Sequence, residues 1–278
     1  MLLSEGASPS SAIDGLDDMI RRMQQIPSGW ARPDSWTMVQ NSYLQLVETL
    51  EQALRSWFED DDGAVAGLYG GYYKLIRDMT ASTPRPSPLI NDEAARQVSV
   101  LERLRAKVAA LEALRGREGQ ISVLDTNVLM HYQRLDEILW AEVLGASPVR
   151  IILPICVIDE LDNKKYTGSD RMSRRAHLAI TALRQCSAEL RPGSAAILPD
   201  GTTLEVFLDD PGHVRMANPD EELRSRCMLL QRAAGRPVTL VTGDLGMQLR
   251  ADAHGLGHAG MPDKYAKDTK RRAAVSED

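Results

Sequence analysis

The chain has 278 residues, of which 26% are charged and 43% are hydrophobic. This length allows one large domain or two of ordinary size, and the composition excludes a wholly disordered chain. The net charge of −6 gives no independent support for nucleic-acid binding. The acidity is concentrated in residues 1–115, where 12 Lys and Arg stand against 16 Asp and Glu.

Residues 1–116 are expected to form an all-helical module. Apolar residues recur every three or four positions from Trp36 to Trp57, which is typical of an amphipathic helix, and Asp34 is placed to cap it. Further helices are expected at 13–26, at 65–79 and, after a proline-rich connector at 81–88, from a cap at Asn91 to Gly116. Because this part contains no histidine or cysteine, we expect it to contact a partner or a second copy of the chain rather than to catalyse a reaction.

The pattern changes at Gly119, where short β-forming runs begin to alternate with helical ones. This alternation predicts a parallel sheet flanked by helices, the architecture of α/β proteins. Strands are expected at 121–124, 149–153, 238–242 and 256–259, and a further strand or an edge hairpin at 203–208. Helices are expected at 135–144, from 155 onward, at 172–190, 218–234 and 245–253. The basic and polar tail from about residue 263 to 278 is expected to be flexible.

Four acidic residues follow strands or begin helices in this second part: Asp125, Glu160, Asp220 and Asp244. Each one alone is explained by helix capping or by a favourable charge at a helix N-terminus. Together they are candidates to meet at the carboxyl edge of the sheet, where several carboxylates repel one another unless a cation neutralises them. Since no histidine or cysteine stands at these positions, Mg²⁺ or Mn²⁺ is a better candidate ligand than Zn²⁺.

Neighbouring residues have supporting roles in this interpretation. Thr126 and Asn127 are candidates to orient Asp125 by hydrogen bonds, and Thr242 is a candidate to do the same beside Asp244, although helix capping explains all three equally well. A local excess of positive charge follows Glu160 and is a candidate surface for a phosphate backbone. Its members are Lys164, Lys165, Arg171, Arg174 and Arg175.

The ordered motifs LDTNVLMH, PICVIDELDNKK, NPDEEL and VTGDLGMQLRADAHGL resemble those of PIN-domain nucleases, over residues 119–262. The resemblance implies a PIN-like sheet and metal-dependent cleavage of RNA, leaving a 5′-phosphate and a 3′-hydroxyl. It places the family's acids on Asp125, Glu160 and Asp244. The third acid falls on Asp220, with three alternatives left open, namely Glu221, Asp209 and Asp210, and Asp252 is an additional candidate.

Other functions remain as alternatives. A PIN fold that binds RNA or protein without cleaving is the main one, and the long N-terminal extension leaves a toxin–antitoxin role undecided. A haloacid-type phosphatase would have a second acid two residues after the first, where this chain has Asn127, and no strand end offers a glycine-rich nucleotide loop.

Cysteine usage and the N-terminus predict a reducing, cytoplasmic location. Cys156, Cys186 and Cys227 are far apart in sequence and lack CxxC spacing, so neither a disulfide framework nor a zinc site is expected. The first residues lack the basic start and apolar core of a signal peptide, and no apolar run approaches about 18 residues. We therefore expect no association with a membrane.

Overall fold

The computed structural model describes residues 3–4, 6–26, 36–59, 64–80, 82–84, 86–186, 194–210 and 213–267. The chain divides into two compact units, Met1–Gly116 and Arg117–Asp278. No helix in the described part of the chain is both long and apolar enough to span a membrane.

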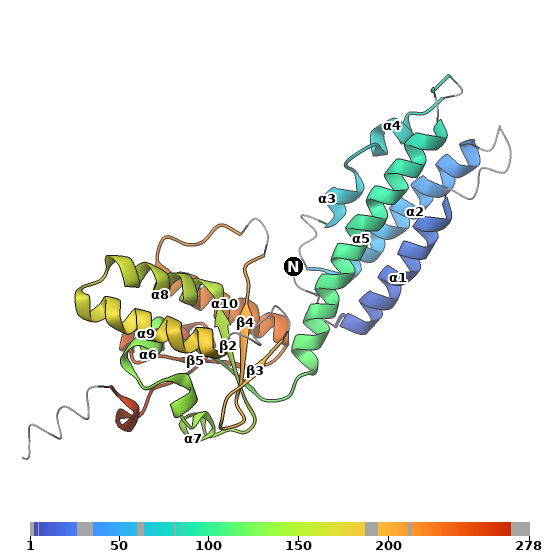
Figure 1. Ribbon diagram of the computed structural model, residues 1–278. Helices are drawn as coiled ribbons and strands as arrows, with labels where there is room; N and C mark the ends of the chain where they lie inside the picture. The colour runs from blue at the N-terminus through green and yellow to red at the C-terminus, as the bar shows by residue number, and fades with distance from the viewer. Residues whose placement is uncertain are drawn as a thin grey trace, which may run out of the picture. The chain divides into compact units, whose positions relative to one another are not determined.

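The first unit is helical, as its periodicity predicts. Its helices are α1 (Pro9–Gln25), α2 (Trp36–Trp57), α3 (Ala64–Leu68), α4 (Tyr73–Arg77) and α5 (Pro86–Gly116). Helix α1 lies alongside part of the longer α5, and α2 packs against both (Figure 1). Their apolar faces form one core, which includes the fully buried residues Leu16, Tyr43, Leu50 and Leu101. The apolar stripe of α5 is therefore buried largely within its own unit.

Two details of this unit differ from the prediction. The single helix expected at 65–79 is wrong, because two short helices form on either side of Gly70 and Gly71, and Gly71 has a φ of +57° that continues no helix. The long helix begins at Pro86, so Asn91 lies inside it rather than at its cap. Proline is favoured in the first turn because its missing N–H has no helical partner there. The predicted cap Asp34 lies outside the described residues.

The second unit is built on a six-stranded sheet with the order β3-β4-β2-β1-β5-β6. The strands are β1 (Gln120–Leu124), β2 (Val149–Pro154), β3 (Ala196–Ile197), β4 (Thr203–Phe207), β5 (Val238–Val241) and β6 (Gly257–Ala259). Neighbouring strands are parallel except β3, which pairs antiparallel with β4 and was not predicted. The predicted α/β architecture is confirmed.

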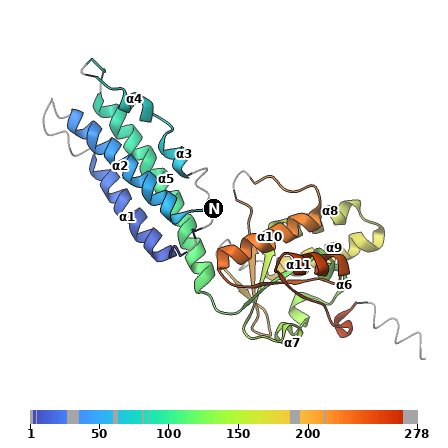
Figure 2. The same ribbon diagram turned by 180° about the vertical axis from the view of Figure 1, so that it is seen from behind.

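Helices connect the strands and cover the sheet. They are α6 (Thr126–His131), α7 (Trp140–Leu144), α8 (Ile155–Thr167), α9 (Asp170–Cys186), α10 (Pro219–Ala234) and α11 (Leu245–Ala253), with short 3₁₀ turns at Leu135–Glu137 and Asp263–Tyr265. Helices α8 and α9 lie side by side (Figures 1 and 2), while α10 packs on β5 and α11 on β6. The helix predicted at 135–144 is wrong, because the 3₁₀ turn and α7 are separate elements.

The strand order creates a switch point beside β1. From β1 the chain adds β2 and then β4 on one side, and afterwards returns to add β5 and β6 on the other side. In open parallel sheets, ligands bind outside the carboxyl ends of the strands at such a point, because the following loops diverge there. This places the residues that follow β1 and β5 at the favoured position for a site.

Candidate active site

Asp125 stands at the carboxyl end of β1 and caps the N-terminus of α6. Its side chain is buried, with 4% of the residue exposed. The backbone N–H of Asn127 donates to Oδ1 at 3.2 Å, and the Thr242 hydroxyl donates to Oδ2 at 2.8 Å. Each carboxylate oxygen therefore has one donor, which holds the group in one orientation while leaving lone pairs for another ligand.

Glu160 lies in the second turn of α8 and reaches the same edge of the sheet. The hydroxyl of Thr126, which is fully buried, donates to Glu160 Oε2 at 2.6 Å. Thr126 directly follows Asp125, so this bond ties the helix after β2 to the end of β1. Thr126 was predicted to orient Asp125, whereas the structure shows it in contact with Glu160; at Asn127, the group that contacts Asp125 is the backbone N–H.

Asp220 and Asp244 each lie at the start of a helix. The backbone N–H of Asp220 donates to the capping Asn218 side chain in the first turn of α10, as the sequence predicts. Asp244 caps α11, where its Oδ1 accepts from the N–H of Met247 at 3.0 Å. The backbone N–H of Asp244 donates to the Thr242 hydroxyl at 3.1 Å, which links it indirectly to Asp125.

The pKa of Asp125 depends on its burial, its hydrogen bonds and the charges near it. Burial raises this pKa above its ordinary value, and the negative charges of Glu160 and Asp220 raise it further, against the lowering effect of the hydrogen bonds from Thr242 and Asn127. Glu160 and Asp220 therefore lie near enough to Asp125 for their charges to act on its carboxyl group. Asp244 joins them through Thr242 rather than by a direct contact with Asp125.

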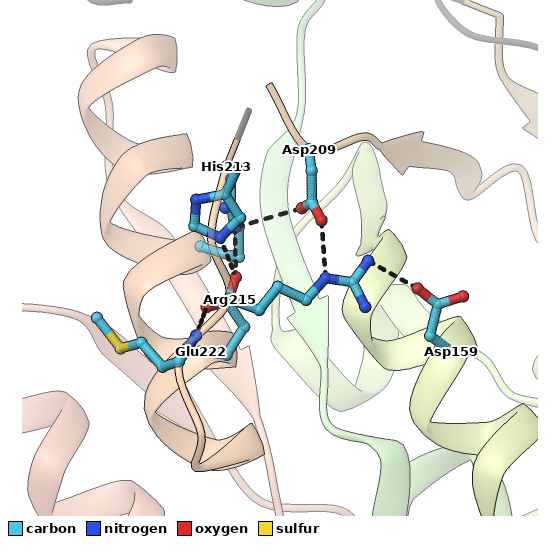
Figure 3. Close-up of polar contacts among 7 residues, drawn as sticks. Asp159, Asp209, His213, Arg215 and Glu222 are labelled. Carbon is cyan, nitrogen blue, oxygen red and sulfur yellow. Dashed lines mark hydrogen bonds and ion pairs between the residues drawn. The ribbon is translucent and has the colours of Figure 1, made fainter. Parts of the chain in front are cut away.

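A tighter group of possible metal ligands lies elsewhere, in the loop after β4 and the first turn of α10 (Figure 3). Within the described part of the chain, Asp209, His213 and Glu222 form the one group of three such side chains whose ligand atoms all lie within 4.8 Å of one another. The guanidinium of Arg226 already occupies the space between the acids, with Nε 2.8 Å from Glu222 Oε1 and 3.5 Å from Asp209 Oδ1. A metal ion at this position would have to displace the buried Arg226.

Arg215 extends this group of charged residues to α8. Its guanidinium is 2.8 Å from Asp209 and 2.6 Å from Asp159, and Figure 3 shows it reaching across from the loop to the helix. Two arginines therefore serve the three acids Asp159, Asp209 and Glu222. Asp209, one of the alternative third acids, faces Arg215 and Arg226, whereas the charge of Asp220 acts on Asp125, which favours Asp220 for the role. Sequence reasoning missed this network, although the i,i+4 spacing of Glu222 and Arg226 was a local signal.

Two further acidic candidates, Glu221 and Asp252, have weaker support as metal ligands. Glu221 is exposed on α10, and Asp252 lies 3.3 Å from His258 of β6 at the end of α11. Neither has a contact that connects it with Asp125.

The predicted basic residues lie on α8 and α9 in different surroundings. Lys164 contacts Glu160 at 2.7 Å, and the Lys165 ammonium lies 4.9 Å from the centre of the Tyr166 ring. Arg175 Nη1 lies 2.5 Å from His131 Nδ1. Arg171 and Arg174 are exposed on α9.

The donor set at the carboxyl edge fits a hard divalent cation. It consists of carboxylate oxygens. Burial raises the pKa of Asp125, and the charges of Glu160 and Asp220 add to this effect, which a bound cation would oppose. Asp125, Glu160 and Asp220 are the residues that would hold it, with Asp244 beside them. Mg²⁺ and Mn²⁺ both prefer such oxygen ligands.

Comparison with known proteins agrees with this architecture. A family model described as "PIN domain" matches residues 122–260, half of the chain. The match begins within β1 and ends just after β6, so it covers the sheet and includes all four predicted acids. A search of curated proteins found no match to the chain.

Proposed function

The chain belongs to the PIN-domain family, whose members are generally metal-dependent nucleases, and we propose that it is a ribonuclease that uses Mg²⁺ or Mn²⁺. The reaction is hydrolysis within an RNA strand: a water oxygen bonds to phosphorus and the bond to the 3′-oxygen breaks. The products are a 5′-phosphate and a 3′-hydroxyl. Asp125, Glu160, Asp220 and Asp244 are the proposed catalytic and metal-binding residues.

The observation that carries this proposal is the placement of Asp125 and Glu160. The Asp125 carboxylate is buried at the carboxyl end of β1, and the hydroxyl of the next residue, Thr126, donates to Glu160. A buried carboxylate at the switch point of the sheet experiences the charges of Glu160 and Asp220, which come from two other helices. Gathering like charges in one place is unfavourable for the fold alone. Such an arrangement therefore supports a role in binding a cation rather than a role in stability.

The chain's own residues would prepare the site for this reaction. Thr242 and the N–H of Asn127 hold the Asp125 carboxylate, and Thr126 holds that of Glu160. A bound divalent ion would lower the pKa of a water molecule and stabilise negative charge on the phosphate. The proposed contacts for the RNA backbone are the basic residues of α8 and α9 that the sequence singles out, namely Lys164, Lys165, Arg171, Arg174 and Arg175.

The test compares the cleavage of labelled RNA by the wild type, Asp125→Asn and a matched control, Asp252→Asn. We expect Asp125→Asn to lose at least about a hundredfold in rate, because a metal-ligand defect weakens ion binding and charge stabilisation together. Asp252→Asn should stay within a few-fold of the wild type, because Asp252 contacts His258 instead. Chelation of divalent ions should stop cleavage, and the product ends identify the bond that breaks.

The same experiment separates the proposal from its main alternative. Equal cleavage by the wild type and Asp125→Asn would show that the assigned centre is wrong. RNA binding without cleavage in either metal would instead favour a catalytically silent PIN-fold scaffold.

The role of the helical unit stays a prediction, namely that it contacts a protein partner or a second copy of the chain. Sedimentation of the full-length protein would check self-association directly. A monomeric mass over a wide range of concentrations would exclude self-association. Binding to a different protein would then be the remaining prediction.

A further inference from the structure

Two of the proposed metal-binding acids have a basic partner of their own. Lys164 Nζ lies 2.7 Å from Glu160 Oε1, and Arg250 Nη2 lies 3.6 Å from Asp220 Oδ2. The lysine comes from α8 and the arginine from α11, so the two cations reach the acids from different elements. Lys164 belongs to the basic stretch that the sequence singles out, whereas Arg250 does not.

Arg250 also lies close to Asp244. A Cβ atom placed on Gly246 would be 3.0 Å from Asp244 Oδ1 and 3.5 Å from both terminal nitrogens of Arg250. The Arg250 guanidinium and the Asp244 carboxylate therefore both lie near Gly246, which has no side chain. Arg250 thus stands close to two of the four acids, one on α10 and one at the start of α11.

The ion pair between Arg250 and Asp220 is weak enough for a metal ion to replace Arg250 at Asp220. Both side chains are about half exposed, at 48% and 47%, and the 3.6 Å separation is longer than a good charged hydrogen bond. Exposed ion pairs of this kind contribute little stability. A divalent cation carries twice the charge and binds several carboxylate oxygens at once, so it competes well for Asp220.

Once a metal ion has displaced it from Asp220, Arg250 can bind a phosphate of the RNA. A guanidinium presents a fork of donors that matches the oxygens of a phosphate, and the RNA strand must bring a phosphate to these acids for cleavage. An RNA phosphate near the acids also needs a counter-charge, because the acids alone would repel it.

We propose that Arg250, with Lys164 in a parallel role, is an exchangeable counter-ion that neutralises the acids before metal binding and contacts the RNA phosphate afterwards. This inference rests on the proposed function, since it takes the same acids as metal ligands and RNA as the substrate. It assigns a substrate-binding role to a residue outside the predicted basic stretch. It also predicts that one substitution, Arg250→Gln, tightens metal binding and weakens RNA binding.

The experiment measures two equilibria separately in the full-length protein carrying Arg250→Gln. The first is the binding of Mn²⁺ alone, by titration calorimetry. The second is the binding of a short single-stranded RNA in Ca²⁺, by fluorescence anisotropy at several salt concentrations, under conditions where no cleavage occurs.

Removing the competing cation should tighten Mn²⁺ binding, by about threefold given the weakness of an exposed pair. RNA binding should weaken by about tenfold, and the dependence of log affinity on log salt should become shallower by about 0.7, the value for one phosphate contact on a single strand. A role confined to holding the fold together would weaken both equilibria.

Two further variants serve as controls. Arg250→Lys keeps the charge and should bind Mn²⁺ as the wild type does, while losing part of the RNA affinity because an ammonium lacks the guanidinium fork. Arg232→Gln removes the same charge from the opposite end of α10, about 18 Å along the helix from Asp220, and should change neither equilibrium.

Three outcomes overturn the inference: weaker Mn²⁺ binding in Arg250→Gln, unchanged RNA binding, or an equal effect in Arg232→Gln. Failure of the proposed function is recognised separately. If the wild type binds Mn²⁺ and RNA but never cleaves, the nuclease proposal fails, whereas opposite shifts in the two equilibria still support the exchange.

Discussion

The Thr242 hydroxyl donates a 2.8 Å hydrogen bond to Oδ2 of Asp125, joining the end of β5 to the end of β1. The same hydroxyl accepts the backbone N–H of Asp244 at 3.1 Å. Because a hydroxyl both donates and accepts, Thr242 connects two of the proposed catalytic acids through one atom. The contact crosses the switch point of the sheet, between residues 117 positions apart.

Thr242→Val should impair both the site and the fold. Valine has nearly the same shape but removes the donor to Asp125 and the acceptor for Asp244, and Thr242 is fully buried. Leaving such groups without a partner costs about 1–3 kcal/mol of unfolding free energy. We expect a loss of about tenfold or more in RNA cleavage, measured with Mn²⁺ at saturation, whereas Thr242→Ser retains the hydroxyl and most of the activity. Full activity in the valine variant would contradict an orienting role.

The Glu222 network predicts a specific dependence of stability on pH. Burial raises the pKa of Glu222, but hydrogen bonds from Arg226, the Met216 N–H and His213 outweigh burial and lower this pKa to about 2. A depressed carboxyl pKa stabilises the folded state above the unfolded value of 4.5, and this stabilisation is lost as the pH falls from 4.5 toward 2. The difference in unfolding free energy between the wild type and Glu222→Gln should therefore be largest near neutral pH.

Denaturant unfolding of the full chain at neutral and acidic pH measures this difference. Glu221→Gln, which makes the same chemical change at the neighbouring exposed residue, is the control and should show little effect. A difference that grows as the pH falls would have the wrong sign for this network.

A second buried ion pair joins Arg150 of β2 to Glu205 of β4, two neighbouring strands inside the sheet. Arg150 Nε lies 2.8 Å from Glu205 Oε1, and the residues are 1% and 7% exposed. Arg117 also contacts the same carboxylate at 2.8 Å. Glu205→Gln removes the charge that these arginines share, so we expect a loss of about 3–5 kcal/mol.

Replacing both members together should be less harmful than that single change. The double variant Arg150→Met with Glu205→Leu leaves no buried charge from the pair and should recover most of the lost stability. Calorimetric unfolding of both variants checks this order. A double variant less stable than Glu205→Gln would show that the pair itself contributes a large net stabilisation.

Gly71 in the helical unit should not tolerate a side chain. Its φ is +57°, and a Cβ atom there would lie 2.5 Å from Glu93 Oε2 and against Arg96 Nε. Glu93 is fully buried and accepts hydrogen bonds from Arg96 and Tyr43, so it has little freedom to move. Gly71→Ala should cost at least about 1–2 kcal/mol from backbone strain alone.

Gly116→Ala at the end of α5 is the matched control, since nothing lies within 4 Å of its added Cβ. Hydrogen exchange of α5 measured by mass spectrometry should be faster in Gly71→Ala and unchanged in Gly116→Ala. Equal protection in both variants would show that the Glu93 network adapts.

The sequence by itself determined the elements whose signals are local. The three-to-four periodicity of α2, the buried run of β1 and the Asn218 cap of α10 all depend on neighbouring residues, and each was predicted close to its observed position. The positions of the four acids after strands or at helix starts were predictable for the same reason. Where two glycines or a proline altered the local backbone, at 70–71 and at Pro86, the predicted boundaries were wrong.

Only the tertiary structure decided which of these residues meet. The bond from Thr126 to Glu160 spans 34 positions, and the bridge of Arg215 between Asp209 and Asp159 joins a loop to a helix that precedes it by about fifty residues. Likewise, the pairing of β1 with β5 brings Thr242 to Asp125. Local periodicity reports which face of an element is buried, but the partner of a polar side chain depends on strand order and helix packing. Those are properties of the whole chain, because they arise from burying many distant apolar faces at once.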